Sequence, residues 1–169
     1  FLSWLGQRPD LIQRTPLWEL ATQHLTIVMI STSIAVIIGL GLGLIIHYSR
    51  SQEIKSMALK AASLGETIPS AAIIALSVPL MGYGNGPIII ALIIYAILPI
   101  LRNTIVGLAS ISRPILEAAV GLGLSRFQQL IKIELPLSKP TLLAGIRTAL
   151  VINISAATIG ATVGAGGFG

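Results

Sequence analysis

Apolar residues are gathered into four long runs, and polar residues lie between them. The runs cover about residues 25–46, 57–81, 87–106 and 141–163. A helix rises 1.5 Å per residue, so a run of about 20 residues crosses the ~30 Å hydrocarbon core of a bilayer. The pattern therefore predicts an all-α polytopic membrane protein with about four spanning helices.

Prolines and one acidic residue interrupt two of these runs. Glu66, Pro69 and Pro79 fall within the second run, and Pro99 falls within the third. A proline inside a helix frees a backbone carbonyl, which a neighbouring helix or water must satisfy. We therefore expect an interrupted second spanning helix and a kinked third one.

Basic residues set the expected orientation in the membrane. Lys and Arg number three in the loop 48–60 and six in the region 102–147, whereas two precede the first run and the turn 82–86 has none. The positive-inside rule then places the N-terminus outside and the loop 109–139 in the cytosol. Trp4 and Trp18 suit a membrane interface, so residues 1–23 are expected to form an N-terminal interfacial segment.

Composition narrows the classes of function. The chain is 54% hydrophobic and 10% charged, with a mean hydropathy of +0.90, values far from those of soluble domains. It has no cysteine, so nothing argues for a disulfide, thiol chemistry or a Cys-based metal site. The net charge of +5 lies in short loops and indicates topology rather than nucleic-acid binding. We expect a single transmembrane domain, residues 1–169, with no metal and no catalytic site, and therefore not an enzyme.

The longest charged amphipathic stretch, residues 117–136, lies within the loop 109–139. Ser112 can cap a helix whose first turn tolerates Pro114, and Gly121 and Gly123 are expected to end it.

A second short helix is expected after these glycines. Ser125 and Gln128 have the spacing of a capping box, and Pro136 is expected to stop the helix. Two short helices joined at glycines would form a knob that docks into a groove on a partner. The alternative is a solvated amphipathic loop without a partner.

The spacing within this stretch is that of a known signature. Glu-Ala-Ala is followed after three residues by Gly, and after nine more by Ile-x-Leu-Pro. The stretch thereby resembles the cytoplasmic loop of permease subunits of ABC importers. The resemblance implies the type I (MetI-like) transmembrane fold and a coupling loop that a cytoplasmic ATPase subunit grips. The residues implied in coupling are Glu117, Ala118, Ala119, Gly121, Gly123, Ile133, Leu135 and Pro136.

Four further runs narrow the resemblance to one branch of these permeases. They are TIPS at 67–70, YAILPILRNT at 95–104, GIRT at 145–148 and the glycine-rich stretch 164–169. They resemble the bacterial osmoprotectant importers for glycine betaine, carnitine and choline, and the similarity runs from about residue 23 onward. The resemblance implies a place in the bacterial inner (cytoplasmic) membrane. It also implies a fifth spanning helix after the glycines, so we expect the given sequence to be truncated.

The resemblance implies the partners and the mechanism. This chain would hold no cofactor, because ATP and Mg²⁺ would be bound by cytoplasmic ABC ATPase subunits. A substrate-binding protein, separate or fused as a domain, would deliver the cargo from outside. A second permease copy, identical or a paralogue, would complete the pathway in the bilayer, with no nucleic acid involved. ATP would then drive alternating access by moving the spanning helices through the coupling loop.

Polar residues inside the runs are candidates for the translocation pathway. Glu66 is the one acidic residue well inside a run, and it either faces the pathway or is a structural carboxylate bonded to backbone amides, Arg102 or Arg147. His24 and His47 flank the first run and are interpreted as interfacial residues. The candidate pathway residues are Glu66, Pro69, Asn153, Ser155 and Thr158, of which the last three are more typical of interhelical hydrogen bonds.

Three alternatives stay open from the sequence. The same importer class could carry another trimethylammonium compound such as ergothioneine. An ATP-independent secondary transporter or channel could use Glu66 as a proton or cation relay. A membrane scaffold could anchor a soluble partner through the same loop and transport nothing.

Overall fold

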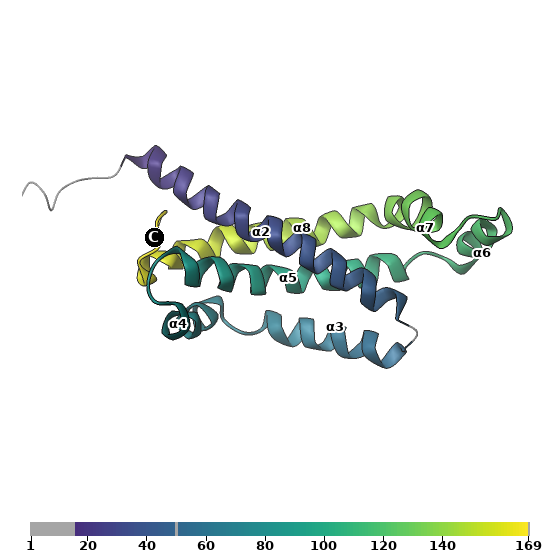
Figure 1. Ribbon diagram of the computed structural model, residues 1–169, viewed down its shortest axis with the longest axis horizontal. Helices are drawn as coiled ribbons and strands as arrows, with labels where there is room; N and C mark the ends of the chain where they lie inside the picture. The colour runs from purple at the N-terminus through teal and green to yellow at the C-terminus, as the bar shows by residue number, and fades with distance from the viewer. Residues whose placement is uncertain (1–15, 50, 169) are drawn as a thin grey trace, which may run out of the picture.

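The computed structural model describes residues 16–49 and 51–168, and every regular element in that part of the chain is helical. Three long helices, α2 (Leu17–Tyr48), α5 (Asn85–Ala109) and α8 (Leu135–Ala157), run alongside one another (Figure 1). Helix α5 packs against both of the others, and α3 (Gln52–Glu66) and α4 (Ser70–Met81) also pack on it. The prediction of an all-α membrane fold is confirmed.

One end of this bundle carries the predicted loop. Helices α6 (Arg113–Gly121) and α7 (Arg126–Gln129) project beyond the long helices (Figure 1). A π-helical turn, η2 (Leu130–Glu134), joins α7 to α8, and a 3₁₀ helix, η3 (Thr158–Val163), follows α8 at the other end of the bundle.

The first spanning helix is longer than its apolar run. It begins at Leu17, directly after Pro16, and Glu19 in its first turn complements the helix dipole. Residues 17–23 are therefore continuous with the spanning helix, and their place at the membrane interface stays a prediction. Trp18 is exposed on that first turn, whereas Trp4 and the rest of residues 1–15 lie outside the described residues.

His24, which was interpreted as interfacial, is a buried residue between two helices. The ring is 5% exposed, and its Nε2 hydrogen-bonds to the carbonyl oxygen of Ile154 at 3.1 Å. This carbonyl is available because α8 tightens into η3, and the N–H of Thr158 bonds to the carbonyl of Ser155 instead. His24 therefore ties α2 to the end of α8.

The second predicted span is interrupted, and it consists of two separate helices. Helices α3 and α4 are bent by 90° at the three-residue break between Glu66 and Ser70. Pro69 lacks an N–H and disfavours helical backbone at Ile68, so the helix cannot run on. The described chain has three helices long and apolar enough to cross a membrane, and the bent pair would make a fourth.

The helical backbone continues through Pro136, where a stop was predicted. Residues 126–163 form one helical stretch, and within it the N–H of Leu135 donates to the carbonyl of Leu130, five residues earlier. A proline removes a donor and crowds the turn before it. The wider π-turn that directly precedes Pro136 accommodates this crowding, so α7, η2 and α8 stay continuous.

Small residues bring α2 and α5 close together. A Cβ on Gly39 would lie 2.8 Å from Cγ2 of Ile100, and a Cβ on Gly43 would lie 2.5 Å from Cβ of Thr104. Gly41, by contrast, faces open space. The Gly39–Gly43 pair thus serves helix packing inside the chain.

Candidate functional site

The projecting loop carries apolar side chains that the bundle leaves uncovered. Leu122 is 81% exposed and Phe127 is 72% exposed. Glu117 and Ala118 are also exposed, whereas Ala119 is buried. Large apolar side chains gathered outside the bundle mark a surface suited to a protein partner. We call residues 113–136 the docking loop.

Gly123 gives the docking loop its turn. Its φ is 74°, in the left-handed region that favours glycine. The N–H of Leu124 donates to the carbonyl of Ala119 at 3.1 Å, and the N–H of Gly123 donates to that of Val120 at 2.9 Å. These two bonds form a Schellman motif, which confirms the predicted end of the first short helix.

The second short helix begins as predicted. The hydroxyl of Ser125 accepts the N–H of Gln128 at 3.3 Å, and the side-chain oxygen of Gln128 accepts the N–H of Ser125 at 2.9 Å. This reciprocal pair is the predicted capping box. Ser112 stands at the N-cap of α6 with Pro114 in the first turn, but its hydroxyl makes no capping hydrogen bond.

The second half of the signature lies at the base of the docking loop. Ile133 belongs to η2, and Leu135 and Pro136 begin α8, whereas Glu117–Gly123 lie in the projecting part. The first half of the signature therefore lies in the exposed part of the docking loop, and the second half lies at the start of the spanning helix α8.

Two polar side chains are buried at this base. Gln129 is 3% exposed and donates from Nε2 to the carbonyl of Leu124 at 2.7 Å. Glu134 is also 3% exposed, and its Oε2 accepts the hydroxyl of Tyr48, the last residue of α2. These contacts hold the loop against its own base and against a second helix.

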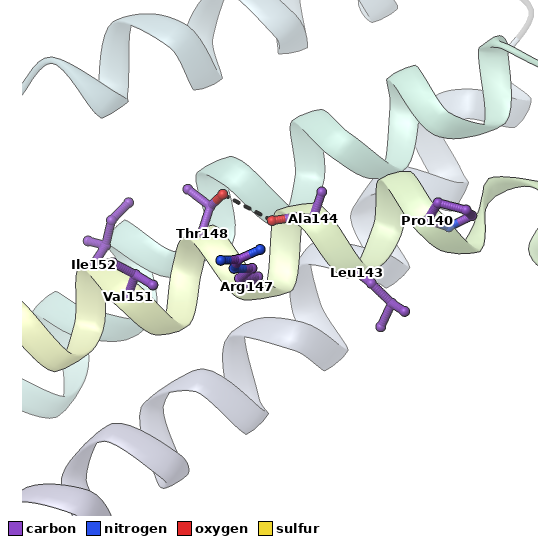
Figure 2. A pocket seen from close by; sticks show the side chains of 7 residues that line it. All are labelled: Pro140, Leu143, Ala144, Arg147, Thr148, Val151 and Ile152. Carbon is purple, nitrogen blue, oxygen red and sulfur yellow. Dashed lines mark hydrogen bonds between the residues drawn. The ribbon is translucent and has the colours of Figure 1, made fainter.

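A groove follows the side of α8 that the bundle leaves open. Its larger hollow, of about 610 Å³, is lined by α8 alone, and Figure 2 draws the lining residues. A second hollow, of about 300 Å³, adds Ser70 of α4, Tyr95 of α5 and Ser155. Val151 and Ile152 line both hollows, so the two lie side by side along α8, and together we call them the α8 groove.

The α8 groove is apolar with polar residues at intervals. Arg147 and Thr148 lie in the larger hollow, where the hydroxyl of Thr148 is turned to the carbonyl of Ala144 at 3.0 Å (Figure 2). Ser155 is exposed in the smaller hollow. Such a surface offers scattered hydrogen-bonding groups without a carboxylate.

Glu66 ends α3 at the break before α4. Its carboxylate lies 3.4 Å from the guanidinium of Arg102 on α5, and its backbone carbonyl accepts the hydroxyl of Tyr95 at 3.0 Å. The structure therefore joins Glu66 to Arg102, one of the two arginines considered from the sequence. Because the two side chains are 27% and 50% exposed, the pair stabilises the fold by at most about 1 kcal/mol. Pro69 lies exposed in the same break.

The three polar residues predicted in the fourth span take different positions. Asn153 is fully buried, and its Nδ2 donates to Oγ1 of Thr32 on α2 at 3.0 Å. It thus forms the interhelical hydrogen bond that the sequence favours for it, and it does not line the α8 groove. Ser155 does line the groove. The hydroxyl of Thr158 donates to the carbonyl of Ser155 at 2.6 Å, within its own helix.

Metal binding has no support in the described part of the chain. There, no group of three or more His, Cys, Asp or Glu side chains could hold a metal ion. That ATP and Mg²⁺ bind a partner subunit stays a prediction.

Residues 35–169 match the family of binding-protein-dependent transport system inner membrane components. The chain belongs to this family. The matched range contains the whole docking loop and the α8 groove, so the resemblance drawn from the signature is confirmed. This permease is therefore a multi-pass membrane protein of a transport system.

Curated relatives of the permease are named for choline transport and osmoprotectant import. The choline transport system permease protein OpuBB of Bacillus subtilis (strain 168) is 36% identical over 147 residues, covering 87% of this chain and 67% of the relative. The osmoprotectant import permease proteins OsmY and OsmW of Salmonella typhimurium are 32% and 40% identical, covering 100% and 89% of this chain and 72% of each relative. The permease spans about two thirds to three quarters of their lengths.

A solved structure shares the fold. In inward-facing conformations of the MetNI methionine ABC transporter, one chain aligns with a TM-score of 0.76 at 21% identity, covering 89% of this permease and 76% of that chain. The type I (MetI-like) ABC importer fold predicted from the signature is confirmed. A secondary transporter and a passive scaffold are not favoured by these relatives.

Sequence reasoning missed the buried polar contacts at the base of the docking loop. Gln129 and Glu134 sit in the amphipathic stretch 117–136, and the sequence analysis assigned neither of them a contact. Tyr48 was placed in a short polar loop, although it is the last residue of α2. The one hint in the sequence was Glu134, an acidic residue placed between Ile133 and Leu135 of the signature.

Proposed function

We propose that this permease is the membrane-spanning subunit of an ATP-driven importer of osmoprotectants with a quaternary ammonium group, such as choline, carnitine and glycine betaine. The observation that carries the proposal is similarity over most of the chain to permeases named for choline and osmoprotectant transport. The intact docking-loop signature supports the ATP-driven class.

The docking loop is the part that an ATPase subunit would grip. Leu122 and Phe127 supply exposed apolar contacts, and Gly123 fixes the turn between them. ATP and Mg²⁺ would be bound by that partner, and this chain would contribute no nucleotide site. The loop would lie in the cytosol with the N-terminus outside, as the distribution of Lys and Arg predicts.

The helix that leaves the docking loop also carries the groove. Residues 126–163 form one helical stretch, so a displacement of α7 is passed along the backbone to the hollows beside Arg147 and Ser155. Rigid helices that move as units are the usual means of alternating access. Movement of the loop would therefore open and close the α8 groove.

The lining of the α8 groove suits a path that lets the solute pass but contributes little to substrate selectivity. Quaternary ammonium groups are best held by aromatic cages, and Tyr95 is the one aromatic residue lining the groove in the described chain. Selectivity would then come from an external binding protein, either separate or fused. A second permease copy would cover the open side of α8. Of the proposed pathway residues Glu66, Pro69, Asn153, Ser155 and Thr158, Ser155 is the one that lines the groove.

Labelling of introduced cysteines tests this pathway and its cargo. The chain has no cysteine, so Ser155→Cys places a single thiol in the groove, and Ser31→Cys places one at a fully buried position as the control. In the assembled importer, a small membrane-impermeant thiol reagent added outside should label Ser155→Cys and not Ser31→Cys. Saturating choline, carnitine or glycine betaine with the binding protein should slow labelling at least about threefold.

Two results would count against this proposal. Labelling of Ser155→Cys that none of the three compounds changes would remove the groove from their path. Protection by ergothioneine alone would keep the importer class and replace the cargo.

A further inference from the structure

Glu134 is a buried acid at a position that the family signature leaves free. It stands between Ile133 and Leu135 in the Ile-x-Leu-Pro half, and its side chain is 3% exposed. Burying a carboxylate is costly unless it is hydrogen-bonded. Its presence at the root of the docking loop therefore calls for a specific partner.

That partner is Tyr48, at the end of α2. The Tyr48 hydroxyl donates to Oε2 of Glu134, and among the described residues this is the one hydrogen bond between α2 and the segment 113–134. The backbone carbonyl of Glu134 accepts the hydroxyl of Ser138 at 2.7 Å, which fixes the turn from the C-terminal side. Glu134 thus contacts two helices at once.

The same base is tied to the exposed part of the docking loop. Gln129 donates to the carbonyl of Leu124, the residue that follows the Gly123 turn. A continuous set of contacts therefore runs from the turn through Gln129 and η2 to Glu134, and from there to Tyr48.

Helices α8 and α2 depend on the loop in different ways. Helix α8 is continuous with α7 through η2, so it follows the loop through its own backbone. Helix α2 has no such continuity, although it packs along α5 and α8. A specific side-chain link would let α2 follow the same displacement.

We propose that Glu134 and Tyr48 are positioning residues that make α2 move with the docking loop during transport. The inference rests on the proposed function, in which an ATPase subunit moves that loop. Their hydrogen bond transmits the displacement to a helix that the signature residues do not reach.

The test compares stability with coupling in the reconstituted importer. Tyr48→Phe leaves a buried carboxylate without its partner, so the thermal stability of the permease should fall. Replacing both partners, as Tyr48→Phe with Glu134→Met, removes both polar groups and should restore stability.

The amount of solute taken up per ATP hydrolysed should nevertheless stay about tenfold below wild type in the double variant, since the hydrogen bond between α2 and the docking loop is lost. Tyr83→Phe and Glu53→Gln, both at exposed positions, are the matched controls and should change neither quantity.

A purely structural role predicts a different outcome. If the double variant regains both stability and uptake per ATP, the link only supports packing and the proposal is overturned. If wild type itself shows no ATP-dependent uptake, the proposed function fails, independently of this link.

A second variant covers the case in which the double variant does not fold. Tyr48→Cys with Glu134→Cys, joined by a short bifunctional thiol reagent, replaces the hydrogen bond with a covalent link. Cross-linked permease should keep ATP-driven uptake, and the same variant before cross-linking should have lost most of it. Arrest of transport on cross-linking would overturn the proposal, since the two ends would then have to separate.

Discussion

At the scale of single residues, two polar side chains inside the bundle form hydrogen bonds between helices. The His24 ring bonds to the Ile154 carbonyl, and the Asn153 amide bonds to the Thr32 hydroxyl, so two hydrogen bonds join α2 to α8. In a membrane interior, where water is scarce, such bonds satisfy groups that would otherwise be costly to bury. They explain why polar residues are tolerated within long apolar runs.

Gly43 offers a direct test of the contact between α2 and α5. A Cβ at this position would lie 2.5 Å from Thr104, so Gly43→Ala must push the two helices apart. We expect a loss of about 1–3 kcal/mol in stability, as in other overpacked cores. Thermal unfolding of the purified permease in detergent measures the change.

Gly41→Ala is the matched control for this prediction. No atom lies within 4 Å of a Cβ at Gly41, and alanine is favoured over glycine in a helix by about 0.5–1 kcal/mol. The control should unfold at the same temperature or higher. Equal destabilisation by both substitutions would show that α2 and α5 do not meet at Gly43.

Single-residue roles were predictable only where the reason is local. The breaks at Gly123 and at Pro69 and the capping box at Ser125 depend on backbone chemistry within a few residues, and each followed from the sequence. Burial of His24 and Glu134 depends on partners far along the chain, Ile154 and Tyr48. Their polarity suggested exposure, and the contacts that override it cannot be derived from local pattern.

At the scale of helices, the turn in the docking loop controls how the knob is presented. Gly123 has a φ of 74° with no atom within 4 Å of a Cβ, so alanine would be strained by conformation alone. Gly121 is in equally open space but inside α6 with helical backbone. Alanine adds the same methyl group at both positions but strains the backbone only at Gly123, so comparing the two variants isolates the effect of backbone strain.

Gly123→Ala should impair coupling, whereas Gly121→Ala should not. The left-handed conformation costs about 1–2 kcal/mol for a residue with a Cβ. A cost of that size lowers the fraction of molecules with a correctly turned loop by roughly fivefold or more. We expect the ATP hydrolysis stimulated by the permease to fall by the same factor. ATPase assays of the reconstituted complex measure this, and equal activity of both variants would show that the turn does not govern docking.

The helices themselves were predicted with two informative errors. Long apolar runs located α2, α5 and α8, because membrane-spanning length is a strong signal. The 90° bend between α3 and α4 was not predicted, because hydropathy continues across Pro69 while the backbone cannot. The stop at Pro136 was wrong, because a π-turn lets the helix pass through it.

At the scale of the whole molecule, the docking loop and the α8 groove belong to one helical stretch. The docking loop projects at one end of the bundle (Figure 1). The lining of the α8 groove includes Ser70, the first residue of α4, and Ile159 in η3. Residues 126–163 connect them. Displacement of the loop by an ATPase can therefore act on the groove through continuous helix. The central claim that follows is that ATP drives transport through this permease.

Uptake by vesicles tests that claim most directly. The permease would be reconstituted with its ATPase and binding protein, and labelled glycine betaine, carnitine and choline would be offered with ATP inside or absent. We expect at least one of the three to accumulate only when ATP is present inside. Equal uptake without ATP would contradict ATP-driven transport, and permease-dependent ATP hydrolysis without entry of any of the three would contradict the osmoprotectant cargo.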